Sequence, residues 1–264
     1  MKTKLLILGC GNSMGVPRID GYWGNCNKNN KKNFRTRCSA IIIKGFNNIL
    51  IDTSPDIKNQ LYNNKISTVS SVIFTHEHAD QTNGLFELRP FTFKNKSSYF
   101  KKNNRIIDVY GNAKTIKLLR KRFDYCFGQN SIYPQIVRSN IIKKKFSLGK
   151  KSEKIHFQTI NVKHGLIKSV AYIFNKTAYL SDCNDLSIVK KKEFQNLKYL
   201  ILDCLKIDKN YAHFNLKESL YIHNHLKPQK TILTNLHSDL DYDYLRSRLP
   251  KNVFPAYDGL ELII

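Results

Sequence analysis

Short apolar runs alternate with polar segments throughout the first half of the chain. Residues 4–8, 39–43, 49–52 and 72–74 are apolar and rich in β-branched side chains, which predicts strands. Turn-forming residues 45–48 lie between two of these runs and predict a hairpin. Helices are predicted after residues 54–56, around residues 85–88 and over residues 113–123, and a further strand is predicted to begin at residue 109.

The second half repeats this arrangement. Strands are predicted over residues 155–162, 171–174, 177–180, 200–203 and 231–234, a helix over residues 217–226, and residues 254–264 close the chain. Polar and ionisable residues follow most strands directly. Because no linker rich in proline, glycine or serine interrupts the sequence, residues 1–264 are interpreted as one domain with two similar halves.

The main chemical feature is His76-x-His78-x-Asp80, which follows an apolar strand directly. Imidazole and carboxylate groups suit zinc, manganese or iron. Two histidines and one aspartate fall short of a closed tetrahedral set, so further ligands must come from elsewhere. The second half supplies three candidates after predicted strands: His164, Asp182 and His237. We expect these groups to meet at one edge of a sheet sandwich.

In this order and with these strand contexts, the motifs resemble the metallo-β-lactamase superfamily. The resemblance covers nearly the whole chain and implies an α/β (α+β) fold, a four-layer αββα sandwich with a metal site at the edge of its two sheets. It implies a hydrolase that attacks its substrate with a metal-bound hydroxide and uses one or two divalent ions, zinc or manganese. It also assigns the ligands: His76, His78 and His164 to one ion, Asp80 and His237 to a second, and Asp182 to both.

Position 81 departs from the superfamily motif, which usually reads His-x-His-x-Asp-His, because Gln81 replaces the last histidine. Glutamine is a neutral and weaker oxygen ligand. The second site is therefore expected to be weaker, to prefer a harder metal such as manganese, or to fill only with substrate. Degraded activity is the alternative. Retained activity is the interpretation adopted, because the other six ligand positions are present.

Within the superfamily, residues 9–17, 75–90 and 233–242 resemble the cyclic-phosphate phosphodiesterases of the carbon–phosphorus lyase pathway. This resemblance implies a small cyclic or diester phosphate as substrate, and the dimer of those enzymes extends the expectation to a homodimer. Those enzymes carry a cysteine-rich structural zinc loop. The corresponding residues 21–26 keep only Cys26, so no structural zinc is predicted.

His213 precedes a predicted helix that starts with Asn215 and Glu218, a capping pattern whose amide groups favour an anion. By the same resemblance, His213 is assigned as general acid or phosphate contact, against the alternative of a capping or surface histidine. Arg35, Arg37 and Arg89 are candidates for bidentate phosphate contacts, although surface or ion-pair roles fit each of them at least equally well.

The chain has 44 lysines and arginines against 20 aspartates and glutamates, a formal net charge of +24. This charge attracts anionic partners. The basic residues are spread along the sequence, as in residues 94–102, so a compositional origin is favoured for most of them. A nuclease acting on RNA 3′ ends is the enzymatic alternative, and nucleic acid is a partner that is not favoured. A non-catalytic binding protein of the same fold is the other alternative.

No apolar run approaches the length of a transmembrane helix, and the apolar run at the N-terminus is too short for a signal peptide. A cytoplasmic location without membrane contact is therefore expected. The six cysteines are scattered singly, which argues against a disulfide framework.

Overall fold

The computed structural model describes residues 2–92, 105–128 and 134–264. Two seven-stranded sheets form the centre of this part of the molecule. The basic stretch at residues 94–102 falls in the gap between the first two ranges and lies outside the described residues. Among the described residues, no helix is long and apolar enough to cross a membrane.

The first sheet is built mainly from the N-terminal half. Its strand order is β14 (Leu260–Ile263), β1 (Lys4–Gly9), β2 (Ser39–Lys44), β3 (Asn47–Ile51), β4 (Ser71–Ile73), β5 (Ile107–Gly111) and β6 (Val137–Ile141). Strands β3 to β6 run parallel. The hairpin between β2 and β3 is tighter than predicted, because β3 begins at Asn47 and Gly45 adopts a left-handed backbone conformation with φ of 61°.

The second sheet comes from the C-terminal half. Its strand order is β13 (Val253–Pro255), β12 (Lys230–Thr234), β11 (Tyr199–Asp203), β10 (Thr177–Leu180), β9 (Ile167–Phe174), β8 (Ile155–His164) and β7 (Lys145–Leu148). Strands β10 to β13 run parallel, and β9 is antiparallel to both β8 and β10. Strands β8, β10, β11 and β12 consequently end at the same edge of this sheet.

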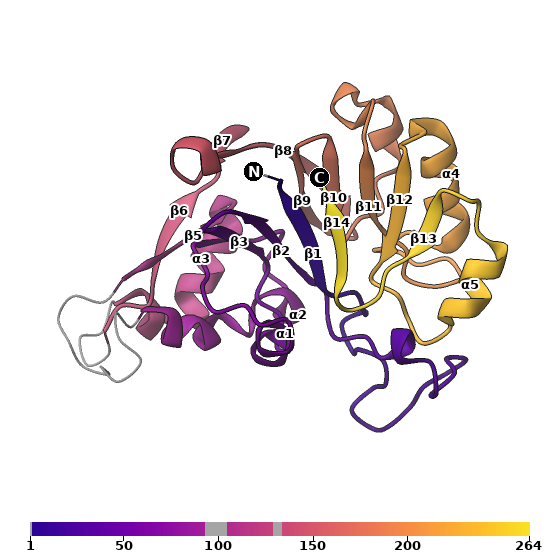
Figure 1. Cartoon of the computed structure of the whole chain (residues 1–264), viewed down its shortest axis with the longest axis horizontal. Coiled ribbons are helices and arrows are strands. Elements are labelled where there is room, and N and C mark those ends of the chain that lie inside the picture. Colours follow the sequence, from indigo (N-terminus) through magenta and orange to yellow (C-terminus); the bar gives the residue numbers. More distant parts are fainter. Residues whose placement is uncertain (1, 93–104, 129–133) are drawn as a thin grey trace.

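Helices accompany both sheets. They are α1 (Ile57–Asn63), α2 (Ala79–Thr82), α3 (Ala113–Arg122), α4 (Leu216–Leu226) and α5 (Tyr242–Arg248). Figure 1 shows α1, α2 and α3 on the side of the N-terminal half and α4 and α5 on the side of the C-terminal half. Strands β1 and β14 pair in the middle of the molecule and bring the two ends of the chain together.

Alternating side chains of the strands separate the core into layers. In β1, Leu5 and Ile7 face the core between the sheets, whereas Leu6 and Leu8 belong to the cluster under the helices. Because successive side chains point to opposite faces of a strand, these continuous apolar runs place apolar side chains on both faces. This is expected of sheets that are covered on both sides. Further clusters join the second sheet to α4 and α5. The layers are helix, sheet, sheet and helix, and this confirms the predicted αββα sandwich.

Candidate metal centre

Three histidines from both sheets converge at the edge where the parallel strands end. His76 and His78 lie in the loop between β4 and α2, and His164 is the last residue of β8. One nitrogen from each ring lies within 4.8 Å of the others, and the ring centroids are 4.5 to 5.0 Å apart. The structure therefore brings together residues that are far apart in the sequence, in the grouping that a metal ion requires.

The ring of His76 is oriented by a relay behind it. Asp52 accepts hydrogen bonds from the Thr75 backbone N–H and from the Thr75 hydroxyl, both at 2.8 Å. The same hydroxyl lies 3.0 Å from Nδ1 of His76. Because the hydroxyl proton is already donated to Asp52, Nδ1 must donate to the hydroxyl oxygen, which leaves Nε2 as a bare lone pair. That Nε2 atom is buried and has no hydrogen-bond partner among the described residues.

His164 is held in the same tautomer, with the proton on Nδ1. Its Nδ1 lies 2.8 Å from the carbonyl oxygen of Ala212, which can only accept. Nδ1 therefore carries the proton, and Nε2 faces Nδ1 of His78 at 3.2 Å. Burial lowers the pKa of His76 to about 3, so this ring is neutral at physiological pH. The histidine side of the site offers the neutral imidazole nitrogens that a divalent cation binds, and the residues present fit such an ion.

Two carboxylates complete the site. Asp182 follows β10 and is 2% exposed, and Asp80 lies in the first turn of α2. Burial and the neighbouring charge of Asp182 raise the pKa of Asp80 to about 6. Burial opposes ionisation of Asp182 as well, but His76, His164 and His213 lower the pKa of that carboxyl. Two carboxylates facing each other in a buried site favour a bound cation.

Gln81 lies between these carboxylates. Its side chain is 1% exposed, and its Nε2 donates to Asp182 at 3.2 Å and to Asp80 at 3.4 Å. Its Oε1 is buried and has no hydrogen-bond partner among the described residues. The glutamine that departs from the superfamily motif is thus in direct contact with two residues predicted as ligands.

His213 closes the site from the segment before α4. Its Nδ1 lies 2.7 Å from a carboxylate oxygen of Asp203, the last residue of β11. Asp203 is fully buried and also accepts from the Cys183 backbone N–H at 2.8 Å and from Asn235 at 3.1 Å. Burial opposes a charge on His213, but Asp203, with Asp182 and Asp80, outweighs it and raises the pKa to about 9. His213 also groups with His164 and Asp182, with ligand atoms within 4.8 Å of one another.

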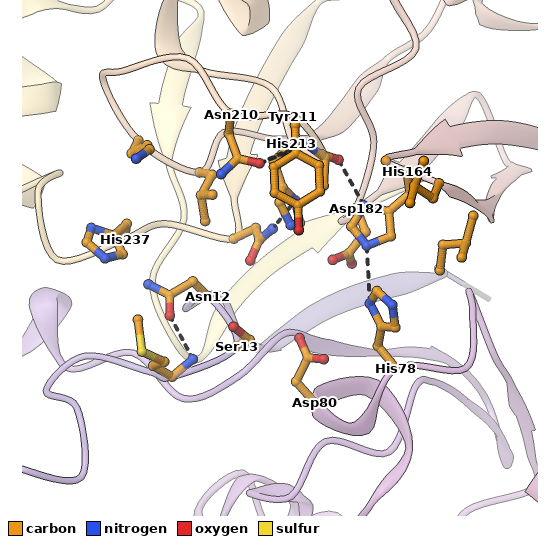
Figure 2. Close-up of a pocket in the computed structure, with 18 residues that line it drawn as sticks. Asn12, Ser13, His78, Asp80, His164, Asp182, Asn210, Tyr211, His213 and His237 are labelled. Carbon is orange, nitrogen blue, oxygen red and sulfur yellow. Dashed lines mark hydrogen bonds between the residues drawn. The ribbon is translucent and has the colours of Figure 1, made fainter.

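A pocket of about 570 Å³ opens over these residues. Asn12, Asn210 and Asn235 offer amide groups to it, and Tyr211, a residue that is 81% exposed, contributes an aromatic ring. Figure 2 shows His78, Asp80, His164 and Asp182 on one side of this pocket, below His213. Lys206 is the one lysine or arginine among the described residues that line it.

The structure does not bring every predicted residue into the cluster. His237 lines the pocket but stands apart from Asp80 and Asp182 in Figure 2, and its Nδ1 lies 3.1 Å from an Asp239 oxygen. His237 belongs to neither group of residues that could hold an ion in the described part of the chain. Its role as a ligand stays a prediction, and Asn235 occupies the position at the end of β12.

The arginines suggested for phosphate binding lie elsewhere. Arg37 makes a two-pronged ion pair with Asp56, at 2.8 and 2.6 Å, and is not among the residues that line the pocket. Arg89 also lies outside the pocket lining, with its guanidinium 5.8 Å from the centroid of the Phe86 ring. Among the described residues that line the pocket, Lys206 and the protonated His213 are the positive charges.

The start of α4 has the predicted capping box, and side chains of the chain itself already accept hydrogen bonds from its backbone N–H groups. Asn215 accepts from the Glu218 backbone N–H at 2.8 Å, and the Glu218 carboxylate accepts from the Asn215 N–H at 3.1 Å. The Leu216 N–H donates to the Lys206 carbonyl. Because a carboxylate of the chain itself sits at this helix start, it is not the anion site that the sequence suggested.

The sequence patterns assign no functional role to Asp203, Asn235 or Lys206. Asp203 carries the signal used for the metal ligands, a carboxylate directly after an apolar strand, and Asn235 follows β12 in the same way. Lys206 gave no signal, since it is one of many lysines spread along the chain.

Comparisons with known proteins agree with this geometry. The sequence profile of the family described as "Beta-lactamase superfamily domain" matches residues 47–235, which is more than half of the chain. The chain therefore belongs to this superfamily. A solved structure described as a new diphosphatase from the PhnP family is 28% identical, with a TM-score of 0.86 over 100% of this chain and 98% of that chain. The chain is thus similar over its whole length to a protein of the PhnP family.

Two more distant structures share the fold, and one curated protein is similar in sequence. Zn²⁺-bound PqqB from Methylobacterium extorquens is 14% identical with a TM-score of 0.75, over 99% of this chain and 100% of that one. Human tRNase Z, short form, is 14% identical with a TM-score of 0.67, over 99% of both chains. An octanoyltransferase from Porphyromonas gingivalis (strain ATCC BAA-308 / W83) is 26% identical over 265 residues, 99% of this chain and 51% of that protein. The chain spans about half the length of this curated relative.

Proposed function

We propose that the protein is a phosphodiesterase that hydrolyses small cyclic or diester phosphates. The observation that carries this proposal is the position of His213. It is held by Asp203 at 2.7 Å beside the histidine and aspartate cluster, at the wall of a pocket of about 570 Å³. Hydrolysis of a phosphodiester needs activation of water, charge neutralisation and a proton for the leaving oxygen, and the site offers groups for all three.

His76, His78, His164, Asp80 and Asp182 are the residues we assign to holding divalent ions. When bound, such ions supply Lewis-acid activation of water and neutralise the charge that develops on phosphoryl oxygens. The residues that orient the ligands are part of the assignment. Asp52 fixes the His76 ring through Thr75, and the Ala212 carbonyl fixes the His164 ring.

His213 supplies the proton. Its Nδ1 is bound to Asp203, so its other nitrogen is free to donate to the leaving alkoxide oxygen. The raised pKa keeps this ring protonated at neutral pH, which suits a general acid. Asp203 positions the ring and stabilises its charge, and Asn235 and the Cys183 N–H hold Asp203 in turn.

Lys206 and the asparagines of the pocket provide contacts for the substrate. Lys206 attracts the phosphate, while Asn12 and Asn210 donate or accept hydrogen bonds at its edge. A pocket of about 570 Å³ has the size of typical small-molecule sites, which favours a small phosphate ester over a long polynucleotide.

Hydrolysis of a phosphoric anhydride is the second candidate function. It is favoured by the 28% identity to a diphosphatase over the whole chain. The test compares bis-p-nitrophenyl phosphate with ADP, using metal-loaded protein and a His213→Ala variant. Faster turnover of the diester supports the phosphodiesterase. Faster release of phosphate from ADP replaces it with the diphosphatase, and turnover of neither substrate rejects both.

A further inference from the structure

The two sides of the metal centre offer different numbers of ligand atoms. On one side, His76, His78 and His164 present three nitrogens within 4.8 Å of one another, and His76 Nε2 is buried without a hydrogen-bond partner among the described residues. On the other side, Asp80 and Asp182 face the amide of Gln81. The first side is a preformed set of donors, whereas the second has two carboxylates, and the imidazole beside it, His213, is held at its Nδ1 by Asp203 at 2.7 Å.

The Gln81 amide already serves as a partner for these carboxylates. Its Nε2 donates to Asp182 at 3.2 Å and to Asp80 at 3.4 Å. This orientation is the one that the two carboxylates favour, since the opposite one would place the amide oxygen against their oxygens. A cation on this side must compete with the two hydrogen bonds, and only a neutral oxygen is available from Gln81 as a replacement ligand.

His237 does not supply the missing imidazole. It lies across the pocket from Asp80 and Asp182, beside Asp239. Asn235, at the end of β12, is bound to Asp203 and lies 3.0 Å from Nδ1 of His213.

We propose that the centre binds two divalent ions unequally, and that Gln81 sets the difference. The three-histidine side holds one ion tightly, and the side of Asp80 takes a second ion only by displacing the amide of Gln81. This inference rests on the proposed phosphodiesterase function, because a phosphate anion supplies the oxygen ligands that the second ion lacks. Phosphate and the second ion therefore bind cooperatively, each tightening the other by the same factor.

The test is a calorimetric titration of chelator-treated protein with Zn²⁺ and with Mn²⁺, repeated with inorganic phosphate present. We expect one tight equivalent and a second that binds about 10- to 100-fold more weakly, with phosphate tightening only the second. Gln81→His adds an imidazole and is expected to tighten the second ion by a similar factor while leaving the first unchanged. Gln195→His, which adds a histidine at an exposed position away from the pocket, is the matched control and should behave as wild type.

Gln81→Glu provides a second variant of nearly the same volume, in case the histidine does not fold at this buried position. Its carboxylate is also expected to tighten the second ion, and thermal melting establishes whether each variant is folded. Two ions of equal affinity in the wild type, or folded variants with unchanged second-ion affinity, would overturn the inference. Unequal binding without hydrolysis of any phosphate ester would reject the proposed function alone, and equal binding with hydrolysis would reject only the role of Gln81.

Discussion

The assignment of His213 as general acid predicts that its loss matters only when the leaving oxygen needs a proton. His213→Ala removes the donor held by Asp203 at 2.7 Å. General acid catalysis contributes about 10²- to 10⁴-fold, so turnover of a cyclic phosphate, which releases an alkoxide, should fall by that factor. p-Nitrophenolate is stable as an anion, and hydrolysis of bis-p-nitrophenyl phosphate should fall by less than about 10-fold.

Asp203→Asn tests the same reasoning one residue further from the substrate. The variant loses the carboxylate that raises the pKa of His213 and orients its ring, so His213 is a poorer and less often protonated donor. We expect a loss of about 10²-fold for the cyclic phosphate and a much smaller loss for the aryl diester. The assay compares kcat for both substrates in wild type and both variants, with metal content measured on each preparation.

Equal losses for the two substrates, with metal content unchanged, would refute the assignment of His213 as proton donor. A loss of bound metal in His213→Ala would instead make it a ligand, in line with its grouping with His164 and Asp182.

Three further predictions concern the scaffold of the site. Asp52→Ala removes the acceptor that orients Thr75 and the His76 ring, so the affinity of the tight ion should fall about 10- to 100-fold in a calorimetric titration; an unchanged affinity would show that the ring needs no such support. Arg35 is 1% exposed, and its guanidinium donates to the Leu240 carbonyl at 2.7 Å. Arg35→Met removes this group, so chemical denaturation should show that the free energy of unfolding falls by at least about 2 kcal/mol. Arg35→Lys should not restore this stability. Burial raises the pKa of Asp258 to about 6, so the folded state takes up a proton as the pH falls through 6, and this carboxyl stabilises the fold increasingly between pH 6 and 4. The free energy of unfolding of the wild type should therefore rise relative to that of Asp258→Asn as the pH is lowered over this range. A difference between the two proteins that does not change with pH would contradict this prediction.

Many strands of the sandwich could be predicted from the sequence because their apolar runs are bounded by polar or turn-forming segments. Strand β4 and the strand pairs β2–β3 and β9–β10 were placed within a few residues of their observed bounds. Strands β6 and β7 were missed, because their burial pattern is broken by exposed polar side chains. Helix α5 was also missed, since its apolar face has only the buried Tyr242 and Leu245 within seven residues.

The ligand loop could be predicted because its spacing is local, and the structure brings His76, His78 and His164 together as expected. The position of His237 could not be predicted in the same way. After β12 the chain turns through a positive φ at Asn235, so that residue faces Asp203 while His237 lies two positions further along the loop. Both residues line the pocket, and the sequence pattern alone does not show which of them lies beside Asp203 and His213.

The arginines illustrate a different limit. The phosphate contact suggested for Arg37 stays a prediction, but its guanidinium is paired with both carboxylate oxygens of Asp56, which is 19 positions away in the sequence. Charge pairing between distant segments has no periodic signal in the sequence.

The measurement that tests the central claim most directly is metal content by elemental analysis, combined with hydrolysis of bis-p-nitrophenyl phosphate in the same preparation with manganese or zinc added. A metal-dependent phosphodiesterase should retain at least one ion per chain and lose turnover when the ion is removed by a chelator. A folded protein that binds no divalent ion and hydrolyses no phosphodiester under any of these conditions would contradict the account.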